Sequence, residues 1–149
     1  MSKRACSATN RIPGVVPDRF PAPERLRGMT VPYWIPVTGG SMVPLLRDGD
    51  LVQVVPFSHD IPAPLWPGVL ILFLQEGMPV VHRYAGMVDG KHLQRADRTG
   101  KTSTVELDDI LGVITLRKRR NRVRRPGMPL RWKLRRGWQW LVDAPWRKR

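Results

Sequence analysis

Short apolar segments separated by glycine and proline form the pattern of the central part of this chain. Valine, isoleucine, leucine and aromatic residues gather in runs of roughly four to eight, and runs of this length bounded by turn residues predict β-strands. Short strands at such spacing favour a mostly antiparallel, barrel-like sheet. The expected strands are Val31–Val37, Leu51–Pro56, Val69–Leu74, Pro79–Tyr84, Lys91–Gln94 and Ile110–Arg117.

Two arms of different character flank this mostly β core, which is expected over residues 31–116. Residues 1–30 have little periodicity and contain Pro13, Pro17, Pro21 and Pro23. This arm is therefore expected to be extended or disordered. Residues 117–149 begin with a basic run that ends at Pro126, after which apolar residues recur at helical spacing at Leu130, Leu134, Trp138 and Leu141. We expect a basic, helical C-terminal arm.

The positive charge is concentrated in this C-terminal arm. Residues 117–149 hold 14 Lys and Arg residues and a single acid, Asp143, whereas residues 1–116 hold 12 basic and 11 acidic residues. The chain's net charge of +14 is therefore +13 in the arm and +1 elsewhere. A basic segment that also carries Trp132, Trp138, Trp140 and Trp146 suits an anionic membrane surface or another acidic partner. Packing of its leucines on the core is the second interpretation, and nucleic-acid binding the third.

Composition also bears on compartment and cofactors. The lone cysteine, Cys6, allows no internal disulfide, so the chain carries no mark of an oxidising compartment. The longest apolar run, Val69–Leu74, has six residues, against about 20 for a membrane-spanning helix. No secretory leader is recognisable. His59 and His92 show no metal-ligand spacing, and no metal or other cofactor is expected. We expect a cytoplasmic protein, peripheral on the inner face of the membrane if the arm binds lipid.

The chemistry of the core centres on a serine in a glycine turn. Gly39 and Gly40 allow a tight bend that presents the hydroxyl and N–H of Ser41, and Met42 and Pro44 supply an apolar shelf beside it. About forty residues later, a strand-like segment carries His82. A serine on a turn and a base on a later strand are the parts of an activated nucleophile.

These residues carry a family resemblance. The segment from Gly39 to Pro44, followed by Gly49 and Asp50, resembles the Gly-x-Ser-Met-x-Pro … Gly-Asp motif of the type I signal peptidases and the related self-cleaving repressors. Further blocks resemble theirs in the same order, with Val69 where Asp is usual and Ala96 where Gly is usual: Pro67–Phe73, Val81–Gly86, Leu93–Asp97 and Ile110–Ile114. The resemblance spans about Val37 to Leu116 and implies an all-β, barrel-like peptidase core.

The resemblance also implies roles for individual residues. His82 precedes Arg83, as in the archaeal and endoplasmic-reticulum type of signal peptidase, whose base is histidine rather than lysine. A neutral imidazole can accept the proton of Ser41 near neutral pH. Asp97 fits a carboxylate that orients His82 or buttresses the site, and Asp108 and Asp109 are rivals for this role. Backbone N–H groups of the Gly39-Gly40-Ser41 turn, chiefly that of Ser41, would stabilise the oxyanion. Some relatives add a hydroxyl at the position of Gly39, so a side-chain donor here would have to be Thr38.

Two classes of function remain open. The first is a serine endopeptidase that removes a leader or signal segment from a precursor peptide or protein, cleaving after small residues as the resemblance implies. The second is a non-catalytic or regulatory peptidase-like module that binds nucleic acid or an acidic partner through its basic arm. A self-cleaving repressor fits less well, because the only Ala-Gly pair, Ala85-Gly86, lies next to the expected base and residues 1–36 show no helix-turn-helix pattern.

Overall fold

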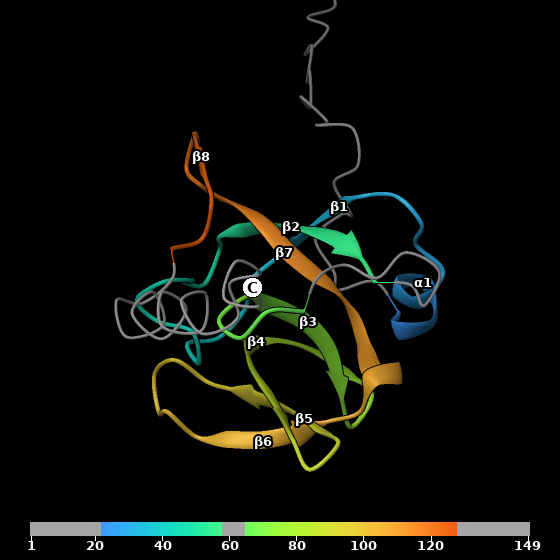
Figure 1. Ribbon diagram of the computed structural model, residues 1–149. Helices are drawn as coiled ribbons and strands as arrows, with labels where there is room; N and C mark the ends of the chain where they lie inside the picture. The colour runs from blue at the N-terminus through green and yellow to red at the C-terminus, as the bar shows by residue number, and fades with distance from the viewer. Residues whose placement is uncertain (1–21, 58–64, 128–149) are drawn as a thin grey trace, which may run out of the picture.

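The described residues form one antiparallel sheet of eight strands (Figure 1). The computed structural model describes residues 22–57 and 65–127. Its elements are α1 (Pro23–Arg27), β1 (Tyr33–Pro36), β2 (Leu51–Pro56), β3 (Leu70–Gln75), β4 (Met78–Val88), β5 (Lys91–Arg95), β6 (Thr102–Val105), the 3₁₀ turn η1 (Leu107–Asp109), β7 (Ile110–Arg119) and β8 (Arg122–Arg124). The strands follow the order β1-β2-β7-β3-β4-β5-β6, and β8 pairs with β7. The described part of the sheet is thus an open path that ends at β1 and β6.

The predicted mostly β, antiparallel class is confirmed. Each of the six predicted strands corresponds to an observed one, and Leu51–Pro56 matches β2 at both ends. Strand β4 is longer than predicted because an irregularity between Tyr84 and Gly86 lets it leave β3 and continue along β5. Two strands are missed, β6 and β8. Their sequences, Thr-Ser-Thr-Val and Arg-Val-Arg, carry too little apolar pattern to be recognised.

The N-terminal arm differs from its prediction over residues 22–29. Pro23 begins the single helical turn of α1, where its missing N–H costs no hydrogen bond. The side chain of Leu26 is buried in the core. The expectation of an extended or disordered arm is therefore wrong for this segment, because one buried leucine attaches it to the sheet. Residues 1–21 lie outside the described part of the chain.

The basic arm also begins differently from its prediction. Strand β7 does not end near residue 116 but continues to Arg119, and then pairs with β8 in a hairpin. The expected boundary between residues 116 and 117 therefore falls inside a strand. Figure 1 shows this hairpin at one end of the molecule and the β5–β6 pair at the opposite end. The helix expected around Leu130–Leu141 lies outside the described residues.

Strand β3 is buried on both faces, which explains its continuous apolar sequence. Leu70, Leu72 and Leu74 belong to one hydrophobic cluster, which also contains side chains of the β1–β2 loop. Ile71 and Phe73 belong to a second cluster on the other face. Because residues paired across two strands share a face, this alternation sorts the side chains of β4 as well.

The first testable prediction concerns Gly112, where β7 passes close to β2. A Cβ atom at this position would lie 2.5 Å from the carbonyl oxygen of Val55 and 2.5 Å from Val54 Cγ1. We expect Gly112→Ala to lower the free energy of unfolding by about 2 kcal/mol, since a backbone oxygen cannot move aside as a side chain can. Urea denaturation measures the change. Gly28→Ala is the control, because its nearest contacts would lie at 3.7 Å. Equal stability of the two variants would contradict the close approach.

Candidate functional site

Ser41 lies in the loop of residues 37–50 that connects β1 to β2. The loop turns at Gly39, whose φ of 82° lies in the left-handed region that glycine adopts without strain. The N–H of Val43 donates to the carbonyl of Gly40 and tightens the bend around the serine. Ser41 is exposed, and neither its N–H nor its hydroxyl donates to an acceptor within the described residues. Both groups are therefore available to a bound molecule.

Buried apolar residues and two arginines hold this loop in place. The side chains of Met42 and Leu46 are part of the hydrophobic core. From β7, Arg117 Nη1 donates to the carbonyl of Leu45 at 2.6 Å, and Arg119 Nη2 donates to the same oxygen at 3.2 Å. The first arginines of the basic arm thus support the loop that carries Ser41.

A carboxylate at the end of the loop completes this support. Asp50 is only 2% exposed, and its two oxygens accept hydrogen bonds from Arg119 Nε at 2.8 Å and Nη2 at 2.7 Å. The N–H of Arg47 also donates to Asp50, at 2.9 Å. Burial by itself raises the pKa of Asp50, but the hydrogen bonds from Arg119 and Arg47 outweigh it and leave the pKa lowered. Asp50 is therefore an ionised structural residue.

An apolar groove of about 300 Å³ opens beside Ser41. One wall is the β1–β2 loop with the end of β1, and the other is the first half of β4. The lining residues are Pro36, Val37, Thr38, Gly39, Ser41, Met42 and Leu46 on the first wall, and Met78, Pro79, Val80 and Val81 on the second. Of the expected binding residues, Gly39 and Met42 line the groove. Gly40 and Pro44 belong to the same loop and are not part of the lining.

The second wall of the groove carries an unpaired strand edge. Residues 78–83 of β4 pair with β3 on one side, whereas the pairing with β5 begins only at Arg83. In the described part of the chain, Pro79–His82 therefore have no neighbour on their second edge. Free N–H and C=O groups along a strand edge can bind an extended peptide.

His82 lies at the end of this free edge. Register places it opposite Ile71, and its ring packs against Phe73 with centroids 5.8 Å apart and planes tilted by 54°. Its Nδ1 lies 2.6 Å from Oε1 of Gln94 on β5. Among the hydrogen bonds of the described residues, none joins Ser41 to His82. The partner that orients His82 in this structure is thus an amide.

Asp97 lies between β4 and the Ser41 loop. Its carboxylate accepts hydrogen bonds from Arg83 Nε at 2.8 Å and Nη2 at 2.6 Å. The N–H of Asp97 contacts Met42 Sδ at 3.4 Å, and the N–H of the next residue, Arg98, donates to the carbonyl of Ser41 at 2.9 Å. Gln94, rather than Asp97, therefore orients His82. Asp97 instead supports the serine turn from its ion pair with Arg83.

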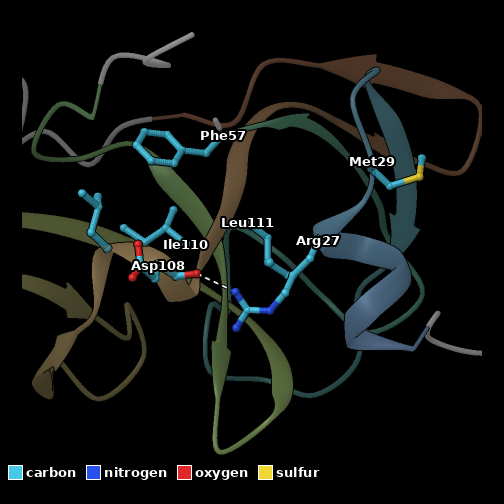
Figure 2. A pocket seen from close by; sticks show the side chains of 7 residues that line it. Arg27, Met29, Phe57, Asp108, Ile110 and Leu111 are labelled. Carbon is cyan, nitrogen blue, oxygen red and sulfur yellow. Dashed lines mark hydrogen bonds between the residues drawn. The ribbon is translucent and has the colours of Figure 1, made fainter. Parts of the chain in front are cut away.

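Asp108 and Asp109, the alternative candidates for orienting His82, contact a different part of the molecule. Arg27 of α1 forms an ion pair with Asp109 at 3.0 Å, and its Nη1 donates to the main-chain oxygen of Asp108 at 2.7 Å. Figure 2 shows this arginine pointing across a second cavity of about 290 Å³ toward Asp108. Both aspartates therefore join η1 to the N-terminal helix.

Arg83 and Gln94 are the residues of this region that the sequence analysis does not assign to the site. A charged residue such as Arg83 within an apolar strand could have indicated a buried ion pair. Gln94 does not stand out in the sequence in this way, because β5 carries polar residues at most of its positions.

Two further properties of the described residues concern metal binding and membrane spans. They contain no group of three or more His, Cys, Asp or Glu residues arranged to hold a metal ion. None of the helices in the described ranges has the length and apolar character that crossing a membrane requires.

The second prediction concerns Asp50. Asp50→Asn keeps the shape of the side chain but leaves Arg119 without its countercharge, so we expect the free energy of unfolding at pH 7 to fall by about 3 kcal/mol. Because the pKa of Asp50 is lowered on folding, its contribution is present above the ordinary aspartate pKa of about 3.9 and is lost as pH falls through the lowered value. Denaturation of both proteins at pH 7 and below pH 3 should therefore show the difference shrinking in acid. A difference that does not depend on pH would contradict this account.

Comparison with known proteins adds no relative from which a function could be inferred: no protein-family model matches the chain, and no curated protein matches it.

Proposed function

We propose that this protein is a serine endopeptidase that removes a leader or signal segment from a precursor peptide or protein. The observation that carries the proposal is the position of Ser41 on a groove whose other wall is a free strand edge ending at His82. A groove beside a free edge can accept an extended peptide, and Ser41 lies on the groove wall opposite that edge. The proposal includes a barrel-like core of the signal-peptidase type, as the motif resemblance implies.

The proposed reaction uses Ser41, which lines the groove, and His82, which lies at the end of the free edge and is not part of the groove lining. Ser41 Oγ attacks the scissile carbonyl carbon while its proton passes to Nε2 of His82. The Ser41 N–H, which has no acceptor within the described residues, donates to the oxyanion of the tetrahedral intermediate. His82 then gives the proton to the leaving amine, and an acyl-enzyme remains. Water hydrolyses this ester by the same steps, with His82 again accepting a proton and returning it to Ser41.

His82 lies on the Ile71–Phe73 face of the sheet, whereas the Ser41 loop packs on the face of Leu70, Leu72 and Leu74, so the contact between Ser41 and His82 has to form when substrate binds. Catalytic hydrogen bonds are often long or misaligned without substrate and shorten in the complex. The elements that bring the two residues together are already connected: Arg98 is bound to Ser41, and Arg95, three residues earlier, pairs with Arg83, the neighbour of His82.

The groove also bears on specificity. Val37, Met42, Leu46 and Val81 make its lining mostly aliphatic, which suits apolar rather than charged substrate side chains. Alanine and glycine near the scissile bond suit this lining, in agreement with the small residues that the resemblance implies.

We propose that the basic arm brings the enzyme to an anionic membrane surface, on the cytoplasmic side. The described part of the arm supports this. Arg120, Arg122, Arg124 and Arg125 are exposed and form no ion pair within the described residues, and Val123 between them is 49% exposed. Cations with an apolar residue at a protruding hairpin suit a lipid headgroup region. The alternative, a non-catalytic module that binds nucleic acid or an acidic partner through the same residues, is separated by the experiments below.

The third prediction tests the catalytic pair. Ser41→Ala and His82→Ala should each lower the cleavage rate at least about a thousandfold, because neither attack nor proton transfer has a substitute. The probe is a library of internally quenched peptides with alanine or glycine fixed before the scissile bond, read by fluorescence and mass spectrometry. Stability should change by less than about 0.5 kcal/mol in Ser41→Ala, since the residue is exposed.

Ser103→Ala and His92→Gln serve as matched controls for these variants. Ser103 lies on β6, and His92 is hydrogen-bonded to Tyr84 at 2.8 Å, a contact that a glutamine amide can retain. Both controls should cleave at the wild-type rate. Wild-type cleavage by Ser41→Ala would sink the proposed mechanism, whereas cleavage by no form of the protein would favour the non-catalytic alternative.

The fourth prediction concerns the hairpin. A triple Arg→Gln variant at positions 120, 122 and 124 should bind vesicles containing phosphatidylglycerol on the order of a hundredfold more weakly, since each cation near an anionic surface contributes about 1 kcal/mol. The control removes the same charge elsewhere, with Arg25, Lys91 and Lys101 changed to Gln, and should lose much less. Vesicle sedimentation of the full chain measures both. Equal losses, or binding to duplex DNA or RNA with none to vesicles, would contradict the membrane proposal.

A further inference from the structure

Gln94 is a buried amide in direct contact with the proposed base. It is 2% exposed, lies opposite Tyr84 in the β4–β5 pair, and places Oε1 2.6 Å from Nδ1 of His82. We propose that Gln94 is a positioning residue that holds His82 in the tautomer with the proton on Nδ1, and that it does so without adding a charge. This inference rests on the proposed function and extends it to a residue that touches neither substrate nor Ser41.

The tautomer follows from the hydrogen-bonding inventory of the two groups. An amide oxygen only accepts hydrogen bonds, so the nitrogen 2.6 Å from it must carry the proton. A neutral imidazole has one proton on its two nitrogens, and Nε2 is then left with a free lone pair. This is the nitrogen that has to accept the proton of Ser41. An amide turned the other way would donate to Nδ1 and leave Nε2 protonated, which would prevent it from acting as a base.

The absence of charge distinguishes this arrangement from a triad with a carboxylate. Asp97 is the carboxylate that the β5 end brings to this region, and Arg83 occupies both of its oxygens. A carboxylate against an imidazole favours the protonated ring, whereas an amide orients the ring without that electrostatic effect. The neutral partner therefore orients the base without a countercharge, at the cost of weaker stabilisation of the imidazolium formed during the reaction.

The other groups around His82 do not provide this effect. From β3, Ile71 and Phe73 are apolar. On the same face of β4 and β5, the titratable groups are Tyr84 and His92, which are hydrogen-bonded to each other at 2.8 Å. Burial raises the pKa of Tyr84, so this phenol stays neutral near neutral pH. Arg83, the next residue of β4, is directed to Asp97. Gln94 is therefore the polar side chain that orients the imidazole.

The fifth prediction is tested by ¹⁵N NMR of the ring nitrogens of His82 in the full chain, a measurement that needs no substrate. Above the titration range, the wild-type protein should show the Nδ1–H tautomer. Gln94→Met should return the ring to the Nε2–H form that free histidine prefers. Gln94→Glu should move the titration midpoint of His82 upward by about one pH unit or more, because the new carboxylate favours the charged ring. Gln53→Met, which removes a hydrogen bond to Thr115 on another pair of strands, is the matched control and should change neither property.

Cleavage of the peptide library provides the second readout. Gln94→Met should lower kcat at least tenfold with KM within twofold of wild type, and Gln94→Glu should shift the rising limb of the kcat profile to higher pH. An Nε2–H tautomer in the wild-type protein, or an unchanged midpoint in Gln94→Glu, would overturn the inference. Failure of the proposed function is seen separately, as cleavage that survives Ser41→Ala, and it leaves the NMR result as it stands.

Discussion

The buried guanidinium of Arg83 is the contact on which the arrangement of the site depends. It is 1% exposed and donates to three oxygens from two parts of the chain: both carboxylate oxygens of Asp97, after β5, and the carbonyl of Gly68, before β3. A charge this deeply buried needs a countercharge and hydrogen-bond acceptors, and removing one partner of such a pair typically costs about 3–5 kcal/mol. The turn that follows β5 is therefore held against β4. Arg98, the residue after Asp97 in this turn, donates its N–H to the carbonyl of Ser41. The serine turn is positioned through this chain of contacts.

The basic strand β7 has two roles that its sequence does not separate. Arg117 and Arg119 are two residues apart and so lie on the same face of the strand. They donate hydrogen bonds to Leu45 and Asp50 and thus support the serine loop from the side of β7. The arginines after them, in the turn and in β8, form no ion pair within the described ranges. The positive charge of the arm is thus partly structural. A truncation near residue 116 would therefore also remove the partner of Asp50.

Much of the fold could be predicted from sequence because the central strands are local features. β2 and β3 are apolar runs bounded by turn residues, and their lengths follow from the run itself. Polar strands at the end of the sheet or in a hairpin lack this pattern, so β6 and β8 were missed. The helix α1 was missed for a related reason, since its stability comes from burying Leu26 rather than from any helical periodicity.

The same division applies to the site. Sequence alone determined the turn that exposes Ser41, the strand that carries His82 and the uneven distribution of charge, because each depends on residues adjacent in the chain. The partners of these residues come from tertiary packing: Gln94 contacts His82, Asp97 pairs with Arg83, and Asp109 pairs with Arg27. The first two of these partnerships depend on the register between β4 and β5, which changes at the irregularity between Tyr84 and Gly86. A shift of one residue would turn every side chain of β5 to the other face, and packing of the whole sheet, rather than any local motif, excludes it.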